Sequence, residues 1–279
     1  MNLQHEIERL YALDTAELKY DPLVGDVCSE VLRSLNHGLI RAAQPDGAGG
    51  WQVNSWVKHG ILLLFRMGKM VDMSSNDIFR FFDKDTLDTK RITIDDGIRV
   101  VPGGSTIRTG AFISPGVICM PPMYINIGAW IGADTMVDSH ALVGTCAQIG
   151  SRVHISAAAQ IGGVLEPAGA RPVIIEDEVL VGGNCGVYEG VRVCRRAVLG
   201  SGVILNASTP VYDLVNQAIL RSTSDKPLEI PEGAVVVAGA RTVQSEWGSQ
   251  HGLSVSTPLI VKYRDEKTDA RTALEGALR

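Results

Sequence analysis

The sequence predicts a mainly β protein: a parallel β-helix preceded by an α-rich N-terminal region and followed by a small C-terminal capping segment. Three observations support this fold: a six-residue repeat in the middle of the chain, helical spacing before it, and loss of the repeat beyond residue 206. They divide the 279 residues into segments 1–100, 101–210 and 211–279. A chain of this length can bury a large core in one or two domains.

The repeat places an aliphatic or small apolar residue at every sixth position from Ile113 to Ile161, and again from Ile175 to Leu205. A period of six fits neither a helix nor a simple strand alternation, so each unit is expected to hold a short strand and a corner. Three units then make one triangular coil whose apolar side chains stack on those of the next coil. Gly or Asp often follows the aliphatic residue, as in Ile131-Gly132. We expect these residues to supply the unusual backbone angles of tight corners.

One interruption breaks the repeat. Between Ile161 and Ile175 the spacing widens from six residues to fourteen. Residues 166–173 are therefore predicted to leave the coil as an external loop. Such a loop can cover a ligand or reach a neighbouring subunit; the alternative is a tolerated surface insertion.

The flanking segments follow other patterns. Residues 1–65 show helical spacing, with apolar pairs such as Ile7 and Leu10 on one face, which favours an α-rich domain. Segments 234–238 and 259–263 are predicted to be strands, and 265–279 a closing helix. These C-terminal elements are expected to cap the open end of the coil.

Composition narrows the possible functions. A formal net charge of −5 disfavours a nucleic-acid binder, which normally carries a basic excess. The longest apolar run, 61–65, is too short to span a bilayer, and no leader pattern precedes it, so a cytoplasmic protein without membrane contact is expected. The five cysteines form no Cys-x-x-Cys pair, which favours reduced, packed thiols over disulfides or a zinc knuckle.

Coil geometry predicts which polar and small residues share a corner. Asp138 begins one column of small residues, which continues in the following coils with Ser156, Gly182 and Gly200. Ser139 begins the neighbouring column, which continues with Ala157, Gly183 and Ser201. Such corners leave a groove bounded by backbone amides, which suits an extended arm with its own amides, such as the pantetheine of CoA. The alternative is that small residues are there because corners are tight.

Asp138 is the one carboxylate in these columns, beside the apolar residues Val137 and Ala141. A carboxylate in such surroundings is a candidate functional group. It can orient an ammonium group and accept its proton, which transfer of an acyl group to an amine requires. His140 is expected on the same strand face, where it would assist as acid or base; otherwise it fills the corner.

Several motifs together resemble the tetrahydrodipicolinate N-succinyltransferase family over about residues 50 to 265. They are Trp56-Val-Lys-His-Gly-Ile-Leu-Leu-Leu-Phe-Arg66, Phe82-Asp-Lys84, Arg99-Val-Val-Pro102, Met136-Val-Asp138, Cys146-Ala-Gln-Ile-Gly150, Gly162-Gly-Val-Leu-Glu-Pro167 and Ile174-Ile-Glu-Asp177. The resemblance implies a left-handed β-helix and a homotrimer with active sites between subunits. It also implies transfer of a succinyl group from succinyl-CoA to the amino group of ring-opened tetrahydrodipicolinate, a step in lysine and diaminopimelate synthesis.

By this resemblance, Arg99 matches the arginine that binds the dicarboxylate substrate and Asp138 the acid that contacts its amine. A guanidinium group pairs bidentately with a carboxylate, which makes the first role chemically reasonable. Arg108 also matches a family arginine and is predicted to bind the second carboxylate or the succinyl end. The alternative for Arg108 is an exposed salt bridge.

The chain departs from the family's better-known members at two places. Gly186 stands where they carry a glutamate, so a two-carboxylate mechanism does not transfer intact; Glu189 is either a replacement or a turn residue. Their Thr-Trp after the acid is Ser139-His140 here. No metal or covalent nucleophile is required, although a Cys146 thiolate intermediate is an open alternative.

Four other functions stay open at this point. An acetyl-CoA-dependent enzyme of the parallel pathway shares the repeat, and another amino acid could be the acceptor. Zinc-dependent β-helices of the γ-carbonic anhydrase type use interface histidines, and His140 and His154 lie in the central coils. A non-catalytic scaffold is the last alternative and predicts no CoA binding.

Overall fold

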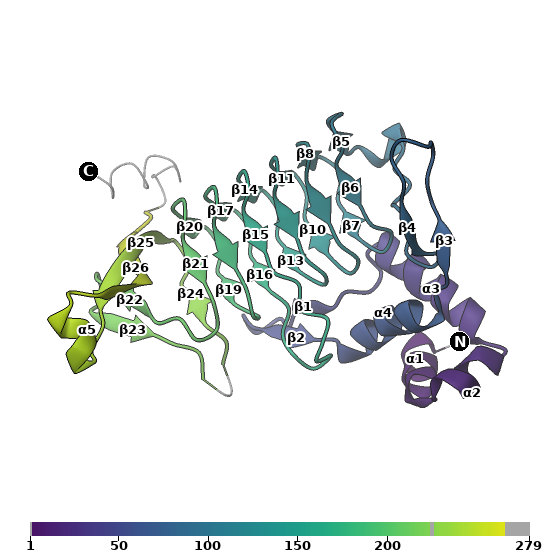
Figure 1. Ribbon diagram of the computed structural model, residues 1–279, viewed down its shortest axis with the longest axis horizontal. Helices are drawn as coiled ribbons and strands as arrows, with labels where there is room; N and C mark the ends of the chain where they lie inside the picture. Colours follow the sequence, from purple (N-terminus) through teal and green to yellow (C-terminus); the bar gives the residue numbers. More distant parts are fainter. Residues whose placement is uncertain (1, 224–225, 266–279) are drawn as a thin grey trace.

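The computed structural model describes residues 2–223 and 226–265 (Figure 1). Its centre is a coil of two-residue strands that run parallel on three faces. Face 1 holds β5 (Arg99–Val100), β8 (Ile118–Cys119), β11 (Met136–Val137), β14 (His154–Ile155), β17 (Leu180–Val181) and β20 (Val198–Leu199). Face 2 holds β6 (Thr106–Ile107), β9 (Tyr124–Ile125), β12 (Leu142–Val143), β15 (Gln160–Ile161), β18 (Gly186–Val187) and β21 (Ile204–Leu205). Face 3 holds β7 (Phe112–Ile113), β10 (Trp130–Ile131), β13 (Gln148–Ile149), β16 (Ile174–Ile175), β19 (Arg192–Val193) and β24 (Glu229–Ile230).

Successive coils are in register with the six-residue repeat. The second residue of each strand points inward, and Val137, Ile155 and Val181 stack in one such column of face 1 without solvent exposure. Equivalent columns on the other faces complete one continuous aliphatic core. The predicted inward ladder is therefore confirmed, and burial of these side chains is the main term that stabilises the coil.

The corners hold a correction to the sequence analysis. Left-handed backbone angles occur three residues after the aliphatic position, as at Asp134 (φ +58°), Cys146 (φ +65°) and Arg152 (φ +55°), and not at the glycine that follows it. A Cβ atom on Gly132 would lie 2.5–2.7 Å from backbone atoms of Gly150 and its successor in the next coil. Glycine follows the aliphatic residue because neighbouring coils approach too closely for a side chain, so the predicted reason was wrong.

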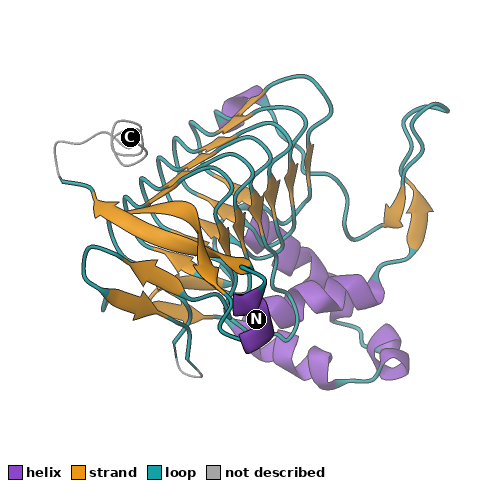
Figure 2. Ribbon diagram, turned by 60° about the vertical axis from the view of Figure 1, so that its left-hand side comes forward, coloured by secondary structure: helices purple, strands orange, loops and turns teal. Residues whose placement is uncertain are grey.

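The N-terminal region is helical, as predicted. It contains α1 (Leu3–Ala12), α2 (Thr15–Tyr20), α3 (Val24–Asn36) and α4 (Ser55–Met67). Asp14 caps α2 in a capping box with Glu17. The apolar faces of α1, α3 and α4 form a second core that includes Ile127 and Cys146 of the coil. The helices therefore pack against the coil, beneath its N-terminal half in Figure 1 and along one side in Figure 2.

Two hairpins extend this region. The first, β1 (Ala43–Pro45) and β2 (Trp51–Val53), lies against face 3, where the Trp51 indole donates to the Glu176 carboxylate at 2.9 Å. The second is β3 (Met70–Asp72) with β4 (Phe82–Lys84), and a short 3-10 turn, η1 (Ile94–Asp96), precedes the coil.

The C-terminal segment extends the coil and then leaves it. β25 (Ala234–Thr242) pairs with β20 and forms a long antiparallel hairpin with β26 (Ser254–Tyr263), on either side of α5 (Glu246–Gln250). β22 (Val211–Asp213) and β23 (Ala218–Leu220) add to the same sheet. The two predicted C-terminal strands are confirmed, whereas the predicted closing helix lies outside the described residues, apart from residue 265.

The close approach of the coils leads to a stability prediction. Gly132→Ala should lower the free energy of unfolding by about 1–3 kcal/mol, because the new Cβ meets backbone rather than a movable side chain. Gly25→Ala in α3 is the matched control, since a Cβ there meets nothing within 4 Å. It should be neutral or stabilising by up to about 1 kcal/mol. Urea unfolding measures both, and equal stability of Gly132→Ala and wild type would contradict the packing argument.

Candidate functional site

Asp138 lies at the corner between faces 1 and 2, directly after β11. Its Oδ1 accepts a hydrogen bond of 2.7 Å from the Ser139 backbone N–H. Its Oδ2 lies 3.8 Å from Nε2 of His154, which is in the next coil on β14. The Asp138 side chain is 30% exposed, so the carboxylate is accessible from solvent.

His154 is a residue whose place beside this carboxylate the sequence analysis missed. Its Nε2 is buried and has no hydrogen-bond partner in the described part of the chain. The coil register could have identified it, because His154 pairs with Met136, two residues before Asp138.

His140 does not occupy the expected position. The strand ends at Val137, and His140 is an exposed turn residue with a φ of +61°. The alternation that would place it on a strand face with Asp138 does not apply in a corner. The expected shared face was therefore wrong, although His140 stays at the same corner.

The two columns of small residues are present in the coil. Asp138, Ser156 and Gly182 each donate a backbone hydrogen bond to the next coil, and Gly200 donates to β25. In the second column, the N–H groups of Ala157, Gly183 and Ser201 have no acceptor among residues 2–223 and 226–265. Donors for a ligand are therefore available at the second column, whereas Gly200 is buried and its N–H is already paired.

The two candidate arginines lie in different surroundings. Arg99 is exposed at the start of face 1, and its strand β5 is two strands from β11 in the same sheet. Arg108 follows β6 on face 2, where it forms an ion pair with Asp83 of the second hairpin. Its predicted alternative, a salt bridge, is therefore present, although the side chain is only 17% exposed.

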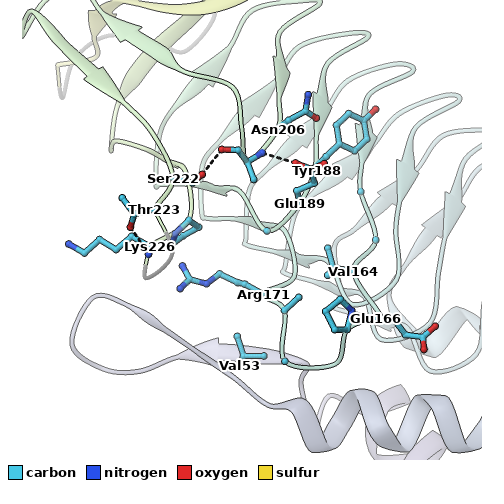
Figure 3. A pocket seen from close by; sticks show the side chains of 18 residues that line it. Val53, Val164, Glu166, Arg171, Tyr188, Glu189, Asn206, Ser222, Thr223 and Lys226 are labelled. Atoms are coloured by element: carbon cyan, nitrogen blue, oxygen red, sulfur yellow. Dashed lines mark hydrogen bonds between the residues drawn. The ribbon is translucent and has the colours of Figure 1, made fainter.

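A cavity of about 820 Å³ opens at the next corner, between faces 2 and 3. The external loop forms one wall with Pro167 and Arg171, and Glu189 and Lys226 line other parts of it (Figure 3). Burial lowers the pKa of the Arg171 guanidinium, and Glu229 opposes that shift from 3.9 Å away. The cavity thus combines two cationic side chains with exposed loop backbone.

The external loop is held by the helical region. The buried Lys58 of α4 donates from Nζ to the backbone carbonyl of Ala170. Leu165, at the other end of the loop, packs against the helical core. The loop is thus part of a built wall, which argues against a loose surface insertion.

Glu189 belongs to this second corner and not to that of Asp138. It is a turn residue with a φ of +53°, and its Oε2 accepts from the Ala207 N–H at 2.9 Å. A single protomer therefore does not bring Asp138 and Glu189 together.

Comparison with known proteins identifies the family. The N-terminal model of tetrahydrodipicolinate N-succinyltransferase matches residues 2–67, and the model of the succinyltransferase hexapeptide repeat matches residues 172–207. A relative from Polynucleobacter asymbioticus, named 2,3,4,5-tetrahydropyridine-2,6-dicarboxylate N-succinyltransferase, is 42% identical over 89% of this chain and 87% of its own. The chain belongs to the tetrahydrodipicolinate N-succinyltransferase family.

A second curated relative agrees with this membership. A protein of the same name from Nitrobacter winogradskyi is 42% identical over 92% of this chain and 90% of its own. Among solved structures, a hexapeptide-repeat acetyltransferase from Vibrio cholerae aligns with a TM-score of 0.32 and 20% identity, covering 43% of this chain and 65% of that one.

The departure from better-known family members at Gly186 has a structural counterpart. A Cβ atom on Gly186 would lie within 2.9 Å of two ring carbons and the hydroxyl oxygen of Tyr188. Tyr188 therefore occupies the space beside β18 where a side chain at 186 would begin. The chain cannot carry a glutamate there unless this ring moves.

No helix in the described part of the chain is long and apolar enough to cross a membrane. Residues 2–223 and 226–265 also contain no group of three or more His, Cys, Asp or Glu side chains placed to hold a metal ion.

The alternative in which the Cys146 thiolate forms a covalent intermediate can be tested. The thiol is fully buried, and burial raises its pKa to about 12. Since the thiolate is the reactive form, iodoacetamide at about pH 8 should modify Cys146 at least 10²-fold more slowly in the folded protein than in urea. Peptide mass spectrometry measures both rates. Rapid modification of Cys146 in the folded enzyme would restore it as a candidate nucleophile.

Proposed function

We propose that this protein transfers the succinyl group of succinyl-CoA to the amino group of ring-opened tetrahydrodipicolinate, 2-amino-6-oxopimelate, in the cytoplasm. Family membership over about nine-tenths of the chain is the observation that carries this proposal. The reaction is a step in lysine and diaminopimelate synthesis.

Asp138 is the proposed acid–base residue. Its carboxylate accepts a proton from the substrate ammonium group, and the neutral amine attacks the thioester carbonyl. Backbone N–H groups of the corner stabilise the oxyanion that forms. The carbon–sulfur bond then breaks, the second amine proton goes to the departing CoA sulfur, and Asp138 releases its own proton to water. The products are the N-succinyl amide and CoA.

Arg99 is proposed to hold a carboxylate of the same substrate. β5 and β11 are separated by two strand spacings, which is about 10 Å. An extended arginine side chain and a seven-carbon dicarboxylate together can span that separation along face 1. A charged, bidentate contact would fix the acceptor relative to Asp138.

CoA has two proposed contact regions at different corners. The free N–H groups of Ala157, Gly183 and Ser201 suit the amides of pantetheine. Arg171 and Lys226 in the loop cavity suit its phosphates. Because these regions do not share a corner, we propose that each active site lies between two protomers of a homotrimer of left-handed coils, with Asp138 from one and the loop cavity from its neighbour.

The environment of Gly186 favours a second candidate acceptor. Tyr188 takes the space where the better-known members have a carboxylate, which changes the chemistry offered to an amine. An acyltransferase for a related amino acid is therefore the second candidate function.

Parallel assays of the purified protein test the proposal. We expect turnover of tetrahydrodipicolinate with succinyl-CoA to exceed turnover with acetyl-CoA, and to exceed turnover of L-2-aminoadipate with either donor. Release of free CoA thiol measures all four combinations. Faster reaction with acetyl-CoA would overturn the donor, and faster reaction with aminoadipate would favour the second candidate.

Asp138→Asn tests the proposed acid–base role. It should lower kcat by about 10²-fold or more, because the amide cannot accept the proton, while CoA binding and thermal stability stay close to wild type. Asp134→Asn, at the neighbouring corner of the same coil, should retain full turnover. Initial rates with both variants measure this, and an unchanged kcat for Asp138→Asn would remove Asp138 from the mechanism.

A further inference from the structure

A second cavity, of about 650 Å³, lies between the β1–β2 hairpin and the coil, at the corner between faces 3 and 1. Trp51 and Pro45 of the hairpin line it, together with Trp130 and Ile149 of face 3. Its size and largely apolar wall are those of small-molecule sites. This cavity lies at the third corner of the triangular coil, so it is separate from both Asp138 and the loop cavity.

Three of the charged residues at this cavity are already paired. Arg192 binds Glu176 at 2.6 Å, and the Glu176 carboxylate also accepts from the backbone N–H of Arg195 at 3.0 Å. The Arg195 side chain binds Glu178 at 2.8 Å. These groups hold the hairpin and the corner together and have little capacity left for a ligand.

Arg41 is a cation at this cavity with unused donors. Its Nε donates to Gln148 at 3.0 Å, and its guanidinium group stacks on the Trp130 ring, 3.8 Å from the centroid. Its two Nη nitrogens have no acceptor among the described residues, and Arg41 is one of the residues that line the cavity. Burial lowers the pKa of Arg41 to about 10, which leaves it cationic at neutral pH.

Asp177 is an anion at the same cavity that forms no ion pair within 4 Å in the described part of the chain, although its charge is one of the lesser contributions that raise the pKa of Arg195, after that of Glu178. Its Oδ1 accepts from the Ser151 N–H at 2.8 Å, and its Oδ2 has no partner in the described part of the chain. The carboxylate is close enough to raise the pKa of Arg41. No ion pair within 4 Å joins the two groups among residues 2–223 and 226–265.

We propose that this cavity binds a free amino acid in its zwitterionic form. The carboxylate of the ligand pairs with the Nη groups of Arg41, and its ammonium group pairs with Oδ2 of Asp177. Its apolar side chain lies against the indole of Trp51 and the side chain of Ile149.

The charge arrangement explains why a zwitterion fits better than a simple ion. An anion alone would pair with Arg41 but would lie near the carboxylate of Asp177, and a cation alone would pair with Asp177 but would lie near the guanidinium group of Arg41. Partly buried charges without partners are costly, so a ligand that pairs both gains from each. A site of this kind discriminates between ligands by unfavourable contacts with the wrong ligand as well as by favourable contacts with the right one.

Calorimetric titration of the full-length protein with three matched probes tests the proposal. L-Phenylalanine carries both charges, 2-phenylethylamine lacks the carboxylate and 3-phenylpropanoate lacks the ammonium group. We expect L-phenylalanine to bind at least about 10-fold more tightly than either analogue, the loss expected for one charged hydrogen bond. Excess CoA should leave this affinity unchanged, which separates the site from the proposed active site.

The Asp177→Asn variant tests whether the charge of this carboxylate binds the ligand. The amide oxygen can still accept from the Ser151 N–H, so the corner is preserved while the charge is lost. Affinity for L-phenylalanine should fall at least about 10-fold, whereas affinity for 3-phenylpropanoate should be retained or increase. Asp134→Asn, a charge removal at the same edge of the coil but outside the cavity lining, should bind like wild type.

Three results would overturn the proposal. One is the absence of heat of binding for both L-phenylalanine and L-leucine up to about 10 mM, a concentration that detects even weak sites. Another is equal affinity for L-phenylalanine and one of its singly charged analogues. The third is wild-type affinity for L-phenylalanine in a folded Asp177→Asn variant, shown to be folded by an unchanged thermal midpoint. Succinyl transfer is measured separately, so none of these outcomes depends on the proposed function.

Discussion

The parallel hydrogen-bond ladder between successive coils is the constraint on which the other features of this protein depend. It places equivalent positions of the repeat directly above one another, so Val137 lies on Ile155 and Asp138 shares a column with Ser156. The same ladder holds the corners so close that the position after the aliphatic residue often has to be glycine. Core and corners therefore follow from one repeated backbone geometry, and the side chains that differ from the repeat mark the places available for chemistry.

The three corners differ in their surroundings because different segments lie over them. At the corner of Asp138, the backbone N–H groups of Ala157, Gly183 and Ser201 have no acceptor in the described part of the chain. The external loop covers the next corner, and Lys58 and Leu165 fix it to the helices. The β1–β2 hairpin covers the third. The helical region thus acts as a support that turns two corners of a plain coil into cavities.

Much of the fold could be predicted because the repeat is a property of sequence alone. Ile113, Val137 and Ile155 lie in the predicted inward positions since each coil imposes the same alternation. The site was harder to predict. His140 was expected on a strand face with Asp138, but the strand is only two residues long, and the register instead brings His154 to the carboxylate. Short strands make alternation a poor guide beyond the second residue, whereas the coil period remains reliable.

The features of the candidate sites that could not be predicted depend on contacts between segments that are distant in the sequence. Arg108 and Asp83 form an ion pair across a hairpin whose position relative to the coil no periodicity encodes. Arg41 and Asp177 are more remote still in sequence, and the fact that neither forms an ion pair within 4 Å among the described residues becomes visible only after the neighbouring charges are paired. Glu176 and Arg192, by contrast, form an ion pair that holds segments at a corner together. The informative residues in a repeat protein of this kind are therefore those whose charge forms no ion pair within the fold, because such a charge contributes little to stability.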